Sequence, residues 1–166
     1  MSSEPHVRSL TEADRVWAEA LLDAELGGRM QARRCALVDV LAGPGLVAVL
    51  DDRPVGLVTW LADASGASAE IRVLAVAEAH RGVGTGRALM DAAAAALRAA
   101  GVRRAWLVTT NDNLAALALY EKAGWRLAAL RPGAIDKARR TIKPAIARIG
   151  EHGIPLRDEL ELAIDL

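Results

Sequence analysis

Cysteine and aromatic residues are scarce in this chain of 166 residues. The one cysteine, Cys35, cannot form a disulfide within the chain, so we expect a reducing compartment, the cytoplasm. Because no histidine lies near Cys35 in the sequence, we expect a buried thiol rather than a nucleophile. Phenylalanine is absent and aromatics make up 3% of the chain, so leucine, valine, isoleucine and alanine must form the core.

Net charge and long apolar runs are missing too. The formal net charge of +0 argues against proteins that bind nucleic acid or membrane surfaces through a basic excess. No apolar run reaches the roughly 18 residues of a membrane span, and no apolar signal-peptide segment follows the polar start Met1–His6. His6, His80 and His152 are far apart in the sequence, so we expect no metal site.

Hydrophobic residues make up 52% of the chain and charged residues 25%, which is typical of a soluble domain with its own core. The length suits one domain, placed over residues 1–166. Segment 131–157 is long for a connection between strands, which indicates a role in specificity or dimerisation.

Hydrophobic spacing and turn residues predict strands that alternate with helices. The first helix starts after Thr11 and stops at Gly27-Gly28. The chain around the helix Thr85–Ala100 reads as a parallel βαβ unit, because both flanking strands are apolar on both faces. The other predicted helices are Gln31–Leu41, Asn113–Lys122 and Ile135–Ile149, and the predicted strands are Val7–Leu10, Leu46–Leu50, Val55–Leu61, Glu70–Val76, Ala105–Thr109, Trp125–Leu130 and Glu159–Leu166.

A glycine-rich turn stands between the strand Glu70–Val76 and the helix that follows. Its sequence is Arg81-Gly82-Val83-Gly84-Thr85-Gly86-Arg87. The first amides of a helix have no partner inside the helix and lie at the positive end of its dipole, so they attract anions. Glycines let a phosphate approach the backbone, and the two arginines add positive charge. This stretch is therefore predicted to bind a pyrophosphate.

Three kinds of pyrophosphate site compete for this turn. A dinucleotide-binding turn needs G-x-G-x-x-G directly after a strand, but Arg87 stands where the third glycine belongs. A P-loop needs Gly-Lys-Ser/Thr at its end, and this chain has Gly-Arg-Ala. A nucleotide-binding βαβ protein stays open as a hypothesis, which a higher affinity for NAD or ATP than for coenzyme A would support.

The third kind of site is indicated by a resemblance of this turn to the signature of a protein family. Arg81–Gly86 matches the R/Q-x-x-G-x-G/A signature of the GNAT (Gcn5-related) N-acetyltransferases. A second motif follows, because N-x-x-A-x-x-x-Y-x-x-x-G-F/W is matched by Asn113, Ala116, Tyr120, Gly124 and Trp125. The match is good over about residues 45–130. The segments 135–139 and 153–159 are similar to a tail of uncharacterised bacterial members, which does not identify an acceptor.

The resemblance implies a fold, a cofactor and its ligands. The fold is α/β (α+β), with a mixed, mostly antiparallel central sheet of six to seven strands, a parallel βαβ core that binds acetyl-CoA, and flanking helices. Acetyl-CoA is the implied co-substrate, and no metal is implied. The implied cofactor-binding residues are Leu74, Ala75, Val76, Arg81, Gly82, Val83, Gly84, Thr85, Gly86, Arg87, Asn113 and Tyr120.

Two catalytic roles follow from the same resemblance. Glu70 is the candidate general base that deprotonates the amine, because an ammonium is not a nucleophile. Tyr120 is the candidate acid beside the coenzyme sulfur, and it is the one tyrosine of the chain. Asn113 is expected to cap the helix that carries Tyr120, besides reaching the pantetheine arm.

The implied function is that of an acetyl-CoA-dependent N-acetyltransferase, an acyltransferase that moves an acetyl group to a primary amine by direct attack in a ternary complex. The alternative is a non-catalytic acyl-CoA-binding or regulatory module on the same fold. Expected partners are a small-molecule or peptide amine and, in a homodimer, a second copy of the chain, without nucleic acid or membrane. The sequence does not identify the amine.

Overall fold

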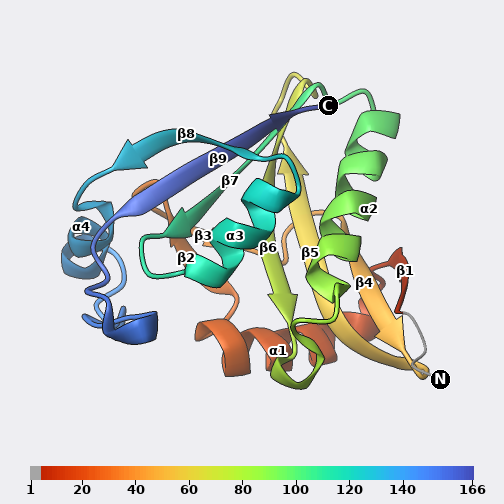
Figure 1. The fold of residues 1–166 in the computed structure, drawn as a ribbon, viewed down its shortest axis with the longest axis horizontal. Helices are drawn as coiled ribbons and strands as arrows, with labels where there is room; N and C mark the ends of the chain where they lie inside the picture. Colours follow the sequence, from red (N-terminus) through yellow and green to blue (C-terminus); the bar gives the residue numbers. More distant parts are fainter. Residues whose placement is uncertain (1–4) are drawn as a thin grey trace. The chain divides into compact units, whose positions relative to one another are not determined.

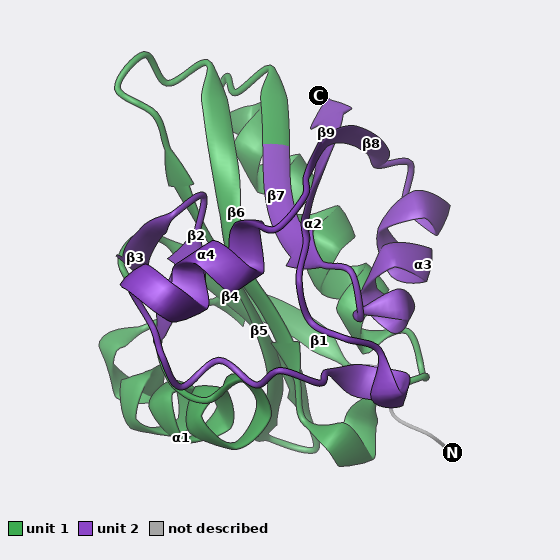
Figure 2. Cartoon of the chain, turned by 90° about the vertical axis from the view of Figure 1, so that its left-hand side faces the viewer, with its two compact units in different colours: residues 1–29, 39–105, 166 green, residues 30–38, 106–165 purple. Residues whose placement is uncertain are grey.

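The computed structural model describes residues 5–166 and divides them into two compact units (Figure 2). Unit 1 comprises the described residues up to Arg29, then residues 39–105 and 166, and unit 2 comprises residues 30–38 and 106–165. The prediction of a single domain over residues 1–166 stays a prediction. Residues 1–4, at the start of the polar segment Met1–His6, lie outside the described residues.

Unit 1 is built on four antiparallel strands, which pair in the order β1-β4-β5-β6 (Figure 1). The hairpin of β4 and β5 turns at Asp51 and Asp52, which both adopt positive φ angles, as a tight two-residue turn requires. The strands are β1 (His6–Ser9), β4 (Gly45–Leu50), β5 (Arg53–Ala62) and β6 (Ser68–Val76), the helices α1 (Arg15–Leu26) and α2 (Thr85–Ala99), and the 3-10 turns η1 (Glu12–Asp14) and η2 (Glu78–His80).

Helix α2 packs across β4, β5 and β6 (Figure 1). Leu89, Met90, Ala93 and Leu97 form its buried stripe. Gly56 of β5 faces this helix, and a Cβ added there would lie 3.1 Å from Leu89 Cδ1. A small residue is needed here because the helix approaches the strand closely. The buried residues are mainly leucine, valine, isoleucine and alanine, as the scarcity of aromatics predicts.

Unit 2 contains β7 from Trp106 onward, and the first two residues of β7 belong to unit 1. The full strand order is β1-β4-β5-β6-β7-β9-β8, and β2 and β3 form a separate two-stranded sheet. The strands of this part are β7 (Arg104–Thr110), β8 (Arg126–Arg131), β9 (Glu159–Asp165), β2 (Met30–Arg33) and β3 (Ala36–Asp39), the helices α3 (Leu114–Lys122) and α4 (Ala134–Thr141), and the 3-10 turn η3 (Glu151–Gly153).

This topology confirms the expected fold class. The sheet has seven strands, and the neighbours β6 and β7 are joined through α2 by a crossover of the kind that parallel strands need. The predicted βαβ unit is therefore present. Among residues 5–166, no helix combines the length and the apolar character that a membrane span needs.

The predicted helix Gln31–Leu41 is wrong. The chain there forms the β2–β3 hairpin, whose turn residues Arg34 and Cys35 have φ angles of 48° and 62°. The buried carboxylate of Glu159 accepts a hydrogen bond from the Arg34 amide at 3.0 Å. That partner is 125 residues away along the chain, so local spacing carried no sign of it.

Two further expectations about this part of the chain need correction. Cys35 is exposed at the hairpin turn and is not a buried thiol. In the segment Ile135–Ile149, where Pro144 is expected to kink or split a helix, α4 ends at Thr141, three residues before the proline. Proline has no amide to continue the ladder and disfavours helical geometry in the residue before it, so the helix stops instead of kinking.

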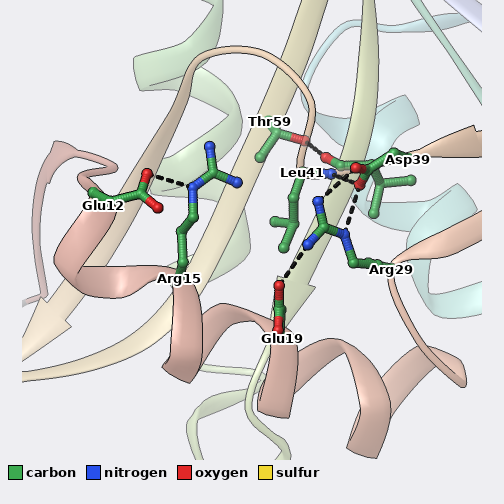
Figure 3. Close-up of polar contacts among 8 residues, drawn as sticks. Glu12, Arg15, Glu19, Arg29, Asp39, Leu41 and Thr59 are labelled. Atoms are coloured by element: carbon green, nitrogen blue, oxygen red, sulfur yellow. Dashed lines mark hydrogen bonds and ion pairs between the residues drawn. The ribbon is translucent and has the colours of Figure 1, made fainter.

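An ionic network in unit 1 closes the base of this hairpin (Figure 3). Arg29 Nε donates to Asp39 Oδ1 at 3.0 Å, and Arg29 Nη1 donates to Glu19 of α1 at 2.5 Å. The Val40 amide also donates to the Arg29 carbonyl at 3.0 Å. The Arg29 guanidinium lowers the pKa of Asp39 through these hydrogen bonds. The residues at which the chain leaves and re-enters unit 1, Arg29 and Asp39, are thus joined by a bidentate ion pair.

A second ion pair fixes the start of α1. Arg8 donates to both carboxylate oxygens of Asp14, at 2.7 and 2.8 Å, and the Thr11 amide and hydroxyl also donate to Asp14. The Asp14 side chain is 7% exposed. The hydrogen bonds from Arg8, followed by those from Thr11, hold the pKa of Asp14 well below its usual range, although burial opposes the shift.

We predict that Asp14→Asn lowers the free energy of unfolding at pH 7 by about 1–2 kcal/mol, a value reduced for the partial exposure of Arg8. Because the pKa of Asp14 is lower in the folded state, its contribution is complete above the unfolded pKa of about 3.9 and is lost as the pH falls below it. Urea unfolding at pH 7 measures the first effect, and repeating it at about pH 2, below the unfolded pKa, measures the second.

The matched control for this prediction is Glu12→Gln. Glu12 forms an ion pair with Arg15 at 2.6 Å, but its side chain is 85% exposed. Such surface pairs contribute little, so the control should change the free energy of unfolding by less than about 0.5 kcal/mol. Equal losses for the two variants would contradict the prediction.

Candidate active site

The glycine turn lies in unit 1, between η2 and α2. Gly82 and Gly84 have φ angles of 75° and 92°, and a Cβ added to either would meet nothing within 4 Å. Gly84 is the N-cap of α2, and the Ala88 amide donates to its carbonyl at 2.9 Å. The amides of Thr85, Gly86 and Arg87 therefore precede the first regular bond of the helix. Open space above the backbone and a helix N-terminus coincide at this turn.

The two arginines of the turn already contact acids. Arg81 donates from Nε to the Val76 carbonyl at 2.9 Å and forms an ion pair with Glu25 of α1. Arg87 forms an ion pair with Asp91 one helical turn further on, at 2.9 Å. Each arginine charge is thus partly balanced within unit 1. The backbone amides, rather than a surplus of arginine charge, are the main attraction that this turn offers to an anion.

Leu74, Ala75 and Val76 form the end of β6 that leads into the turn. They pair with Val58, Leu57 and Gly56 of β5. Ala75 is buried, whereas Leu74 and Val76 are half-buried, as alternation along the strand requires. The strand therefore enters the turn in a fixed register, which positions the amides at the start of α2.

Glu70 also lies on β6, and the structure buries it. Its side chain is 9% exposed, and Oε2 lies 2.8 Å from Nε of Arg72. The two residues are two positions apart on a strand, so they share one face of the sheet. Glu70 is a buried carboxylate beside an arginine, not an acid in bulk solvent. Arg72 is missing from the predicted site residues, although the alternation of side chains along a strand is a signal that would have found it.

Asn113 and Tyr120 belong to unit 2, at the two ends of α3. The side chain of Asn113 accepts a hydrogen bond from the Ala116 amide at 3.3 Å, which confirms the predicted helix cap. Tyr120 is buried, and its ring centroid lies 6.4 Å from that of Trp125. The Trp125 amide donates to the Tyr120 carbonyl at 3.0 Å, so two residues of the N-x-x-A-x-x-x-Y-x-x-x-G-W motif are hydrogen-bonded to each other.

Burial sets the protonation state of Tyr120. Loss of water around the phenol raises its pKa to about 12, and the positive charge of Arg33 opposes part of this rise. The phenol is therefore protonated throughout the neutral range and can donate a hydrogen bond. Arg33 stands on β2 in the same unit, and the helix predicted over Gln31–Leu41 could not indicate this proximity.

His80 is the histidine nearest to the glycine turn in the sequence. His80 is half-buried at the end of η2, before the glycine turn. Among residues 5–166, no group of three or more histidine, cysteine, aspartate or glutamate side chains is arranged to hold a metal ion.

Comparison with known proteins decides the family. The sequence profile of the Acetyltransferase (GNAT) family matches residues 10–125, which include both the glycine turn and the Asn113–Trp125 motif. The chain belongs to this family. The uncharacterized protein YxbD of Bacillus subtilis (strain 168) is 39% identical over 116 residues, which are 70% of this chain and 70% of YxbD.

Solved structures agree with this GNAT assignment. The IAA acetyltransferase from Bacillus cereus ATCC 14579 is 25% identical, with a TM-score of 0.78 over 98% of this chain and 99% of that chain. A GNAT family acetyltransferase from Elizabethkingia anophelis, solved with acetyl-CoA bound, has a TM-score of 0.77 over 99% of both chains. At 18% identity, this structural likeness shows a shared fold and no more.

We predict that Gly84→Glu abolishes coenzyme A binding by this GNAT protein, because the new side chain would fill the open space with a negative charge. Calorimetric titration measures the affinity. The control is Gly101→Glu, since Gly101 has a φ of 83° and also meets nothing within 4 Å. It lies past the opposite end of the 15-residue α2, about 22 Å away. Near-native affinity in Gly84→Glu would defeat the prediction.

Proposed function

We propose that this protein transfers the acetyl group of acetyl-CoA to a primary amine by direct attack in a ternary complex. The observation that carries the proposal is the open glycine turn at the start of α2, in a chain of the GNAT family. The amides of this turn suit the diphosphate of coenzyme A, and the backbone of Leu74 to Val76 suits the pantetheine arm as an added strand would.

Glu70 takes the proton of the attacking amine in this proposal. A lysine-type amine with a pKa near 10.4 is unprotonated in only one part in ~10³ at pH 7, so a base has to act before attack. The neighbouring Arg72 favours the ionised carboxylate, the form that accepts a proton. The proton passes from the amine to Glu70, directly or through a water molecule.

Tyr120 stabilises the leaving thiolate. Full proton transfer from a phenol of pKa about 12 to the conjugate base of a thiol of pKa about 8.5 would be uphill by about 5 kcal/mol. The phenol therefore acts as a hydrogen-bond donor to the developing negative charge on sulfur, and water protonates the released coenzyme. A backbone amide near Leu74–Val76 polarises the thioester carbonyl.

We further propose that the protein is cytoplasmic and forms a homodimer. An exposed cysteine without a disulfide partner suits a reducing compartment. The strand β8 is last in the order of the sheet and exposes Leu127 and Leu130, which supports association through that edge.

We predict that Tyr120→Phe lowers kcat by about 10²-fold, because it removes the hydrogen bond to sulfur while the ring stays packed against Trp125. Release of free thiol from acetyl-CoA over an amine panel measures turnover, and thermal unfolding checks that the ring still packs. Coenzyme A binding without turnover in the parent protein would favour a non-catalytic acyl-CoA-binding module instead. Unchanged kcat in the variant would refute the role of the phenol.

We predict that Glu70→Gln lowers kcat/KM by about 10²-fold or more, with the largest loss at low pH, where the amine is most protonated. The control is Arg72→Gln, which breaks the same ion pair but keeps the carboxylate. Profiles of rate against pH separate the two effects: Arg72→Gln should keep the base-dependent limb of the profile but move it to higher pH, because the cation that favours the ionised carboxylate is gone. A Glu70→Gln profile that matches the parent would remove Glu70 from the mechanism.

A further inference from the structure

A carboxylate lies on the buried face of α1, close to the segment that leads into the glycine turn. Ala18, Leu21 and Leu22 form the buried stripe of this helix, and Glu25 occupies the next position of the same stripe. Its side chain is 17% exposed. A charge at a position where helical spacing favours an apolar residue needs a partner, because burying a charge without one is costly. The contacts of Glu25 therefore show what this position is for.

Glu25 has two partners, one on each side of the 3-10 turn η2. One carboxylate oxygen accepts a hydrogen bond from the Glu78 amide, at the start of η2, at 3.3 Å. The other oxygen forms an ion pair with Arg81, which follows η2 and begins the glycine turn. One side chain of α1 thus holds both ends of the segment that joins β6 to the turn.

The guanidinium of Arg81 extends this contact to the sheet. Its Nε donates to the carbonyl of Val76, the last residue of β6, at 2.9 Å, while its Nη2 contacts Glu25. The guanidinium therefore joins the end of β6 to α1. A three-residue 3-10 turn is too short to hold its shape by its own hydrogen bonds, and glycines leave the backbone that follows free to move. Contacts from outside therefore restrict this part of the chain.

Arg87, at the other end of the turn, is paired differently. Its partner Asp91 lies one turn further along the same helix, and both side chains are about half exposed. A pair within α2 ties the turn to no other element, and surface pairs of this kind contribute little to stability. The two arginines of the turn thus have the same charge but differ in what they connect.

We propose that Glu25 and Arg81 are positioning residues of the coenzyme A site, because they brace the glycine turn and Arg81 holds Glu25 rather than the diphosphate. This proposal rests on the proposed binding of acetyl-CoA at the turn. An anion site made of backbone amides binds well only while the amides are held in place, since ordering them on binding costs conformational entropy. Loss of a negative charge near an anion site strengthens binding by itself, whereas loss of a brace weakens it.

The sign of one affinity change tests the proposal. We expect Glu25→Gln to weaken the affinity for coenzyme A by about tenfold in calorimetric titration, as loss of a charge-assisted contact does. In turnover, the loss should appear in KM for acetyl-CoA and not in kcat. Thermal unfolding shows whether the variant is folded. Unchanged or tighter binding of coenzyme A by Glu25→Gln would overturn the brace.

The matched control is Asp91→Asn, which removes the same charge from beside the other arginine of the turn. Because this pair ties the turn to no other element, the control should leave the affinity for coenzyme A unchanged or slightly higher. An equal loss of affinity in Asp91→Asn and Glu25→Gln would overturn the proposal.

A double variant separates a brace from a phosphate ligand. If Arg81 acts only together with Glu25, Arg81→Gln should lose about as much affinity as Glu25→Gln, and the double variant no more than either. Arg81→Lys should show most of the same loss, because one ammonium cannot span the Val76 carbonyl and Glu25 as the guanidinium does. Additive losses, or full affinity in Arg81→Lys, would assign Arg81 to the diphosphate and overturn the proposal.

Hydrogen exchange without any ligand keeps the test separate from the proposed function. The amides of His80 and Arg81 form hydrogen bonds around η2 that do not involve Glu25 directly. Their exchange, followed by NMR, should be at least about tenfold faster in Glu25→Gln than in the parent protein, and unchanged in Asp91→Asn. Faster exchange supports the brace even if the protein binds no coenzyme A. Unchanged exchange in Glu25→Gln would overturn the brace, whatever the protein acetylates.

Discussion

The proposed binding of the acetyl donor depends on the amides at the start of α2. A helix cannot satisfy its first amides from within, and here the left-handed glycines Gly82 and Gly84 keep side chains away from them. The sheet decides where these amides lie. Gly56 admits Leu89 of α2 close to β5, and β6 enters the turn in register with β5. The proposed anion site, which is made from backbone, therefore depends on close packing several residues away.

The two units set the charge states of their catalytic candidates in opposite ways. In unit 1, the carboxylate of Glu70 is buried together with Arg72, so a negative charge is kept inside the protein by a positive one. In unit 2, the burial of Tyr120 outweighs the charge of Arg33, and the phenol keeps its proton. A carboxylate paired with a cation and a protonated phenol are the two side chains that the proposed amine acetylation uses.

Two segments, residues 30–38 and 131–157, are held by polar side chains. The hairpin at residues 30–38 has its base closed by Arg29 and Asp39 and its tip held by Glu159. Segment 131–157 is tied to the end of β7 by the side chain of Asn111, which donates to the Pro155 carbonyl and accepts from the amides of Arg157 and Asp158. Polar side chains therefore fix the ends of both segments.

Neighbours in the chain are enough to predict the sheet-forming runs, the βαβ unit, the cap at Asn113 and the family, because each rests on alternation, helical spacing, glycines or a short motif. Long-range contacts decide that Gln31–Leu41 is a hairpin, that Cys35 is exposed, that Arg81 meets Glu25 and that Arg33 acts on Tyr120. Those outcomes depend on partners many residues away, such as Glu159 for Arg34, and the free energy of such contacts exceeds the small preferences of the local backbone.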